Sequence, residues 1–470
     1  MFIGRSEELS NLKHFQEMAE SSLCVIYGRR RIGKSLLIEH SLKLKRTLFF
    51  EGLEKRPRKK QLEHFVEQFK YMCPEAVIPD KISSWKQMFL SLYEFVKDHP
   101  SVIVFDEFQW MANYRTEIVS EFKFVWDRYF SKLDGQKIIL CGSIASFMIG
   151  KVIKSSALYG RIELEIQVKG FSLSETKLMF PQKSCYEVAE AYMFTSGVPK
   201  YLSLLAPYTS IRSGIANLSY SHKGYFRTEY ERIFLSHFGS NKDFETIIVT
   251  LLQHPYGLTR EQIVTLGKVS AGGQLSIHLD DLEAAGFISS FIPVDKKANS
   301  RLKKYLVTDA YMRFYHHFIL PNLKDDIHGS VEEHFGSLAH SGAFHNWIGR
   351  SFEYLVMHHV PTVVKRMGLE GLKYNAGPYF NAATKKSSGL QVDLLLDRTD
   401  QVLSVIEMKY SSTPVGIQII PELERKLEWL REKFKTKTVQ PVLVTKIPPT
   451  KELIDSGYFI KIFCLEDLFE

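Results

Sequence analysis

Short apolar runs alternate with amphipathic stretches over the first third of the chain. Four runs, at 23–28, 47–53, 101–107 and 137–143, are rich in β-branched and aromatic residues, which favours β-strands. The stretches between them, such as 58–72, have the periodicity of helices. Strands that are apolar along their whole length are typical of a parallel sheet with helices on both faces. The pattern therefore predicts an α/β fold built on a parallel sheet.

The pattern changes twice after this part. Residues 171–240 are helical in pattern, and the strand-like runs stop there. Residues 241–318 contain three helical stretches followed by two short strand-like pieces, which is typical of a winged helix-turn-helix. A polar, histidine-rich stretch around 320–345 predicts a linker.

The last part of the chain mixes helices and strands again. A helical stretch at 347–360 precedes two strand-like runs, QVDLLLD and VLSVIEMKY. A helix over 420–435 and the strands PVLVTK and YFIKIFC complete the pattern. The chain is therefore predicted to hold four domains, which are 1–170, 171–240, 241–318 and 319–470.

The segment GRRRIGKS, residues 28–35, matches the phosphate-loop pattern GxxxxGK[ST] between a predicted strand and a predicted helix. Its glycines let backbone N–H groups surround a β-phosphate, Lys34 reaches the β- and γ-phosphate oxygens, and the Ser35 hydroxyl coordinates Mg²⁺. The expected ligands are therefore ATP or ADP and Mg²⁺. The predicted nucleotide-binding residues are Gly28, Arg29, Arg30, Arg31, Ile32, Gly33, Lys34, Ser35 and Leu36.

Two carboxylates follow the apolar run VIVF at the end of a later predicted strand. Asp106 is expected to hold Mg²⁺ through water, and Glu107 to orient and polarise the attacking water. Ser143 ends the next predicted strand. It either senses the γ-phosphate beside that water or caps a helix, and the sequence leaves both interpretations open.

Residues 1–240 resemble the archaeal-type ATPase family, within the AAA+/STAND class of phosphate-loop proteins. The resemblance implies that an N-terminal Gly-Arg box, here Ile3, Gly4 and Arg5, lies against adenine. It also implies that 171–240 form a helical lid that contributes Pro199. The motifs that carry it are FIGRSEEL (2–9), GRRRIGKS (28–35), VFDEFQW (104–110), LCGSIASFM (140–148), LYGR (158–161) and SGVPKYL (196–202).

Arg161 lies in the LYGR motif and has two interpretations. It is either an arginine finger that acts on the γ-phosphate of a neighbouring subunit, or a surface arginine at the start of a strand. The first interpretation implies a homo-oligomer.

A second candidate site lies in the C-terminal domain. Asp393 sits in QVDLLLD, and Glu407 and Lys409 lie two residues apart in VIEMKY, so they share one strand face. With Glu353 on the preceding helix, this is the arrangement of the PD-(D/E)XK nuclease fold. Asp393 and Glu407 would bind Mg²⁺, Lys409 would activate water, and Glu353 would bind a second metal ion.

The family resemblance extends to this domain, because archaeal-type ATPases often carry a C-terminal nuclease-like domain with GxxFE and QxDLL…EXK elements. The alternative is a fold that no longer cuts, in which these charges form a buried ion-pair cluster. In the winged helix, the segment 272–286 is acidic and poorly suited to DNA. The predicted wing is basic, so this domain either contacts DNA through the wing or serves only as a packing domain. The basic wing residues are Lys296, Lys297, Arg301, Lys303 and Lys304.

Composition narrows the function little. The chain is 45% hydrophobic and 24% charged, as in soluble globular proteins, and its net charge of +8 permits nucleic-acid binding without demonstrating it. The five cysteines are scattered, which argues against a zinc or disulfide framework. The charged N-terminus and the lack of long apolar runs predict a cytoplasmic protein with no membrane partner.

We therefore expect ATP hydrolysis coupled to DNA binding or cleavage. The alternative is a nucleotide-gated switch or scaffold whose nuclease-like domain does not cut.

Overall fold

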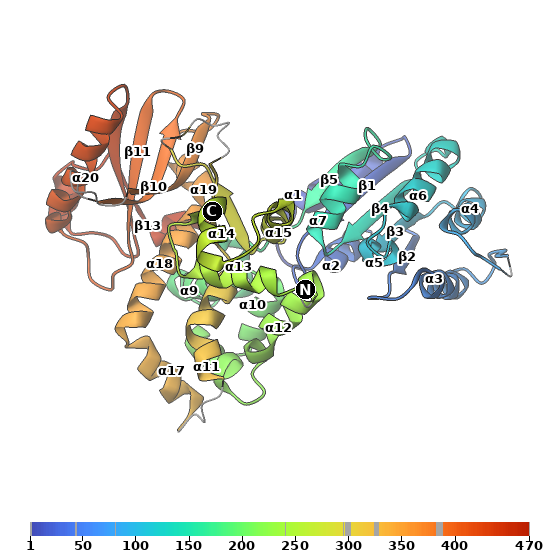
Figure 1. Ribbon diagram of the computed structural model, residues 1–470, viewed down its shortest axis with the longest axis horizontal. Coiled ribbons are helices and arrows are strands. Elements are labelled where there is room, and N and C mark those ends of the chain that lie inside the picture. Colours follow the sequence, from blue (N-terminus) through green and yellow to red (C-terminus); the bar gives the residue numbers. More distant parts are fainter. Residues whose placement is uncertain are drawn as a thin grey trace. The chain divides into compact units, whose positions relative to one another are not determined.

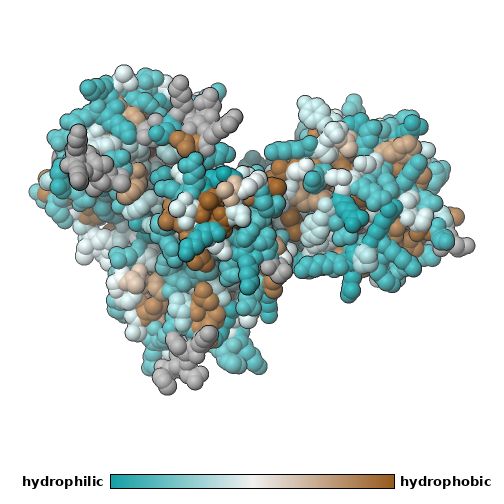
Figure 2. All heavy atoms as spheres, in the orientation of Figure 1, coloured by the Kyte–Doolittle hydropathy of each residue, from teal (hydrophilic) through white to brown (hydrophobic). Residues whose placement is uncertain are grey.

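The computed structural model describes residues 2–42, 45–79, 81–239, 241–294, 296, 302–323, 329–381 and 389–469. The chain forms two compact units, Met1–Gly170 and Phe171–Glu470 (Figure 1). No helix in the described ranges is long and apolar enough to cross a membrane. On the face drawn in Figure 2, hydrophilic residues cover most of each unit, and hydrophobic residues gather in small groups.

The first unit is built on a five-stranded parallel sheet in the order β2-β3-β4-β1-β5. Four strands lie at the predicted runs, so the predicted α/β class and parallel sheet are confirmed. Strands β1, β3 and β4 are buried at every position, as expected for strands covered on both faces. The strands are β1 (Ser22–Tyr27), β2 (Thr47–Glu51), β3 (Val102–Asp106), β4 (Lys137–Gly142) and β5 (Ile162–Gln167).

Helices cover both faces of this sheet (Figure 1). Residues of α1 and α2 pack against β1, β3 and β4 in one hydrophobic core. On the other face, Phe65, Phe89 and Phe122 from three helices surround Phe105 of β3. The helices are α1 (Ser6–Glu17), α2 (Lys34–Ser41), α3 (Arg58–Met72), α4 (Trp85–Val96), α5 (Phe108–Met111), α6 (Glu117–Arg128) and α7 (Ala145–Phe147).

The second unit begins with helices and continues with a small antiparallel sheet in the order β6-β8-β7. The helices are α8 (Leu173–Met179), α9 (Cys185–Thr195), α10 (Pro199–Leu205), α11 (Ile211–Tyr220) and α12 (Tyr225–Phe238). The next elements are α13 (Lys242–Leu252), β6 (Leu258–Thr259), α14 (Arg260–Gly267), α15 (Gly273–Ala284), β7 (Ile288–Phe291) and β8 (Lys304–Val307).

The linker predicted around 320–345 is wrong for most of its described part. This region contains α17, and α18 begins within it. A capping box between Ser330 and Glu333 starts α17, and buried Phe335 anchors it. The helices between the two sheets of this unit are α16 (Ala310–Phe314), α17 (Val331–Ala339), α18 (Gly342–His358) and α19 (Val360–Arg366).

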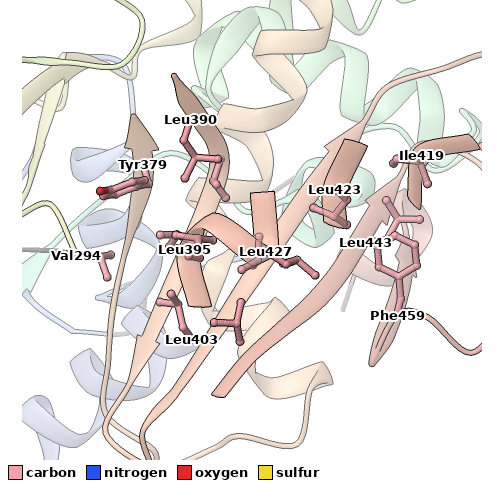
Figure 3. Close-up of a cluster of buried hydrophobic side chains, with 14 of the residues drawn as sticks. Val294, Tyr379, Leu390, Leu395, Leu403, Ile419, Leu423, Leu427, Leu443 and Phe459 are labelled. Atoms are coloured by element: carbon pink, nitrogen blue, oxygen red, sulfur yellow. The ribbon is translucent and has the colours of Figure 1, made fainter. Parts of the chain in front are cut away.

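A second five-stranded sheet, in the order β13-β12-β11-β10-β9, ends the chain. Strands β9, β10 and β11 are antiparallel, whereas β11, β12 and β13 are parallel. Helix α20 packs on this sheet through Leu423 and Leu427, which Figure 3 labels, and through Leu430. The elements are β9 (Tyr374–Asn381), β10 (Leu390–Arg398), β11 (Val402–Lys409), α20 (Ile420–Lys433), β12 (Thr438–Thr445), α21 (Lys451–Asp455) and β13 (Lys461–Cys464).

Candidate functional site

The predicted phosphate loop joins the end of β1 to the start of α2. Gly28, Arg31 and Gly33 have φ angles of 152°, 73° and 82°, so the backbone curls before α2 begins at Lys34. A Cβ atom at Gly28 would lie 2.3 Å from the Val168 carbonyl oxygen, so a larger residue does not fit there. A loop of this form at a helix N-terminus presents backbone N–H groups to an anion.

Polar contacts hold two side chains of this segment. The Ser35 hydroxyl donates to Asp106 Oδ2 at 2.6 Å, which joins α2 to the end of β3. Lys34 is 7% exposed, and its Nζ donates to the Arg29 carbonyl oxygen at 3.1 Å. A hydroxyl and a carboxylate in contact are oxygen ligands of the kind that Mg²⁺ takes beside a nucleotide phosphate. The residues present therefore fit Mg²⁺ and a polyphosphate.

Glu107 and Ser143 lie in direct contact at the same edge of the sheet. Ser143 Oγ donates to Glu107 Oε2 at 2.6 Å. The Gln109 amide donates to Glu107 Oε2 and, at 3.1 Å, to Ser143 Oγ. Gln109 is fully buried and was missed from the sequence, although it lies only two residues beyond Glu107. Its amide helps to fix the direction of the Glu107 carboxylate.

Glu51 adds a third carboxylate at this edge, because it pairs with Asp106 across β2 and β3. Partial burial raises the pKa of Glu51, and the charges of Asp106 and Glu107 raise it further. Negative charge at this edge would be stabilised by a divalent cation.

The Arg5 side chain holds the phosphate loop from outside. Its Nη2 donates to the carbonyl oxygens of Ile32 and Lys169 at 3.1 and 2.7 Å. Arg30 instead pairs with Glu54 at 3.3 Å, 4.8 Å from the centre of the Trp110 ring. Among the other predicted residues, Ile3 and Gly4 precede α1, Leu36 is 56% exposed on α2, and Pro199 begins α10 in the second unit.

Arg161 lies just before the amino end of β5. The phosphate loop follows the carboxyl end of the parallel strand β1, so the two lie at opposite ends of the strands. Its Nε and Nη2 donate to the two oxygens of Asp127 at 2.6 and 3.0 Å. These bonds hold the pKa of Asp127 below its usual range. The position excludes a role in the chain's own site and leaves both interpretations of Arg161 open.

The structure brings the four residues predicted for a C-terminal site into one cluster. Asp393 on β10 and Glu407 on β11 are 8% and 2% exposed. Asp393 Oδ2 accepts from the Met408 N–H at 3.0 Å, and Glu407 Oε1 accepts from Lys409 Nζ at 2.7 Å. The antiparallel pairing of β10 with β11 places the two acids next to each other.

Glu353 on α18 is the third acid of this cluster. Arg350 Nη1 donates to Glu353 Oε2 at 3.0 Å. Burial raises the pKa of Glu353, and the charge of Asp393 adds to the effect. Burial also raises the pKa of Asp393, as does the charge of Glu407. Burial and neighbouring carboxylates thus both disfavour the charged forms of Glu353 and Asp393, and a cation bound among them would favour those forms again.

Lys426 on α20 also belongs to the cluster, although no local sequence signal indicates it. Its Nζ lies 3.1 and 2.9 Å from the two oxygens of Glu407.

Within the described ranges, no group of three or more His, Cys, Asp or Glu side chains is arranged to hold a metal ion. Magnesium often takes only one or two carboxylates, with water and phosphate oxygens as its other ligands. Asp393 and Glu407 fit this smaller set.

Comparison with protein families identifies the class of the first unit. Residues 2–205 match the model of an ATPase domain found predominantly in Archaea. The matched residues include the phosphate loop and the end of β3, and the match ends at residue 205. The predicted ATPase domain is therefore supported over this range.

Three individual proteins show how far along the chain each similarity reaches. An uncharacterized protein of Methanocaldococcus jannaschii is 25% identical over 422 residues, which cover 87% of this chain and 88% of the relative. An uncharacterized ATP-binding protein of the same organism is 42% identical over 53 residues, which cover 11% of this chain and 90% of the relative. Among solved structures, a Walker-type ATPase of Pyrococcus abyssi is 19% identical to this chain, with a TM-score of 0.48. The alignment covers 66% of this chain and 95% of the Pyrococcus abyssi chain.

We expect Lys34→Ala to abolish measurable ATP binding in calorimetric titrations with Mg²⁺, because the variant lacks the ammonium that is predicted to contact the phosphates. Arg30→Ala is a matched control from the same loop, since Arg30 contacts Glu54 and Trp110. Its affinity should fall by no more than about fivefold, because a surface ion pair contributes little. Tight ATP binding by Lys34→Ala would overturn the assignment of the loop.

Arg161 provides a separate test. If it acts on a neighbouring subunit, the ATPase rate per chain should rise with protein concentration. Arg161→Ala should remove that rise and leave ATP binding intact. Asp127→Asn is the matched control, because it breaks the same ion pair and leaves the guanidinium in place. A wild-type ATPase rate per chain that does not depend on protein concentration would refute the interpretation of Arg161 as an arginine finger.

Proposed function

We propose that this protein binds and hydrolyses ATP with Mg²⁺, and that the nucleotide state controls DNA binding or cleavage by the second unit. The contact between Ser35 and Asp106, inside the matched ATPase domain, is the observation that carries the first part. Lys34 holds the phosphates, and Glu107 orients the attacking water with Ser143 beside it. Mg²⁺, when bound, stabilises the charge of the phosphoryl group.

In this proposal, residues 171–240 form the helical lid that contains Pro199, and residues 241–318 form a winged helix. The arrangement of α13, α14 and α15 with the sheet β6-β8-β7 supports the winged helix. Helix α15 carries Asp280, Asp281 and Glu283, which makes it a poor ligand for DNA phosphates. We assign DNA contact to the basic wing instead. Lys297 and Arg301 of this wing lie outside the described residues.

Residues 319–470 form a PD-(D/E)XK-type nuclease domain in the same proposal. The arrangement of α18, the mixed sheet and α20 supports it, together with the convergence of Asp393, Glu407 and Lys409. Asp393 and Glu407 supply the oxygen ligands of a divalent ion, and Lys409 directs water to the phosphodiester. Glu353 would bind a second ion in this proposal.

One observation favours the alternative of a nucleotide-gated switch that does not cut. Both oxygens of Glu407 accept hydrogen bonds from lysine ammonium groups, so the cluster also satisfies itself as an ion-pair network. Under this alternative, ATP controls assembly, and the C-terminal domain binds without cleaving.

The double variant Glu407→Ala, Lys409→Ala distinguishes the two functions. Cleavage of a mixture of single- and double-stranded DNA and RNA, with Mg²⁺ or Mn²⁺ and with or without ATP, should be abolished, while ATPase activity persists. Asp397→Ala, Lys437→Ala is the matched control, because it removes another acid–lysine pair, which joins β10 to the residue before β12. This control should still cut.

Absence of cleavage by the wild-type protein on every substrate would favour the switch. Cleavage that survives in the Glu407–Lys409 double variant would remove the nuclease role from this cluster.

A further inference from the structure

Lys426 forms hydrogen bonds with Glu407, the carboxylate on which the proposed metal site depends. Its Nζ lies within 3.1 Å of both Glu407 oxygens, and Lys409 Nζ lies 2.7 Å from one of them. Glu407 is 2% exposed, so water does not compete freely for these oxygens. One buried carboxylate therefore accepts hydrogen bonds from two ammonium groups at once.

A divalent ion would need the same oxygen lone pairs. Carboxylates bind Mg²⁺ directly through their oxygens, at shorter range than any hydrogen bond. An ammonium that bridges both oxygens lies in front of the carboxylate, where such an ion would approach. The ammonium and the ion also repel each other, and burial strengthens that repulsion. Lys426 and a metal ion are therefore competitors for Glu407.

Lys426 has a second carboxylate within reach. Glu422 lies one turn earlier on α20, with Oε1 3.9 Å from Lys426 Nζ, and its side chain is 59% exposed. Leu423 and Leu427 fix the helix between and beside these residues, because they point into the core against the sheet (Figure 3). The lysine side chain can therefore turn from Glu407 to Glu422 while the helix backbone stays in place.

We propose that Lys426 is a positioning residue that keeps Glu407 closed to metal, and that it moves to Glu422 when a divalent cation binds. This inference rests on the proposed metal site at Asp393 and Glu407. It makes an opposite prediction from a lysine that only orients Glu407 for its metal. Removing an orienting lysine would weaken metal binding, whereas removing a competing lysine strengthens it.

The test is a titration of the full-length protein with Mn²⁺, in which binding is measured by calorimetry and by electron paramagnetic resonance. The C-terminal component is the binding that Asp393→Asn abolishes. Lys426→Met should bind Mn²⁺ about tenfold more tightly than the wild type, because a hydrogen bond to a charged group no longer competes. Lys426→Arg keeps the positive charge and should not tighten binding.

Glu422→Gln tests the second position of the lysine without changing the cluster itself. It should weaken Mn²⁺ binding by about two- to fivefold, since Lys426 loses an exposed partner to move to. Lys437→Met is the matched control, because its partner Asp397 lies outside the cluster, and it should leave the affinity unchanged.

Unchanged or weaker binding by Lys426→Met, with normal wild-type binding, would overturn this inference and leave the proposed metal site standing. If neither protein shows Asp393-dependent binding, the metal site itself is refuted. Binding by Lys426→Met alone would support both.

Discussion

The hydrogen bond from Ser35 to Asp106 joins the two strand ends from which the nucleotide site is built. It links the first turn of α2, which follows β1, to the end of β3. In the sheet, β4 lies between β1 and β3, and β1 and β3 are buried at every position. Because the strands are parallel, their carboxyl ends meet at one edge, and that edge collects the phosphate loop, Glu107 and Ser143. Arg5 holds the loop from the N-terminal turn through the carbonyl oxygen of Ile32. The rigid sheet thus sets the distances that phosphate chemistry requires.

The C-terminal cluster follows a different logic. Its acids lie on two neighbouring strands and on α18. Burial raises the pKa values of Glu353 and Asp393, and repulsion from neighbouring carboxylates adds to the effect. Lys409 and Lys426 offset the charge of Glu407, so the cluster is stable as an ion-pair network and also has the ligands of a metal site. The same contacts are therefore consistent with a metal-dependent nuclease site and with an ion-pair network that does not cut. Competition for Glu407 is the physical property that separates these states.

Local signals in the sequence predicted much of this structure. Apolar runs located β1 to β4, and the GxxxxGK[ST] spacing located the loop, because both depend on neighbouring residues. Strand β9 was missed because Gly377 and Pro378 interrupt its pattern, which is tolerated since β9 lies at a sheet edge. Helix α17 was mistaken for a linker, although the Ser330–Glu333 capping box was a usable signal. The contact of Lys426 with Glu407 depends on how α20 packs, which no local pattern encodes.

The most direct measurement is single-turnover ATP hydrolysis by Glu107→Gln, combined with ATP binding by the same variant. The variant keeps the loop, Lys34 and the Ser35–Asp106 contact, so ATP should bind with Mg²⁺ at wild-type affinity. Hydrolysis should fall by about 10²- to 10⁴-fold, because the carboxylate that polarises water is lost. Hydrolysis at the wild-type rate by Glu107→Gln, with binding intact, would contradict the assignment of this edge of the sheet as the catalytic site.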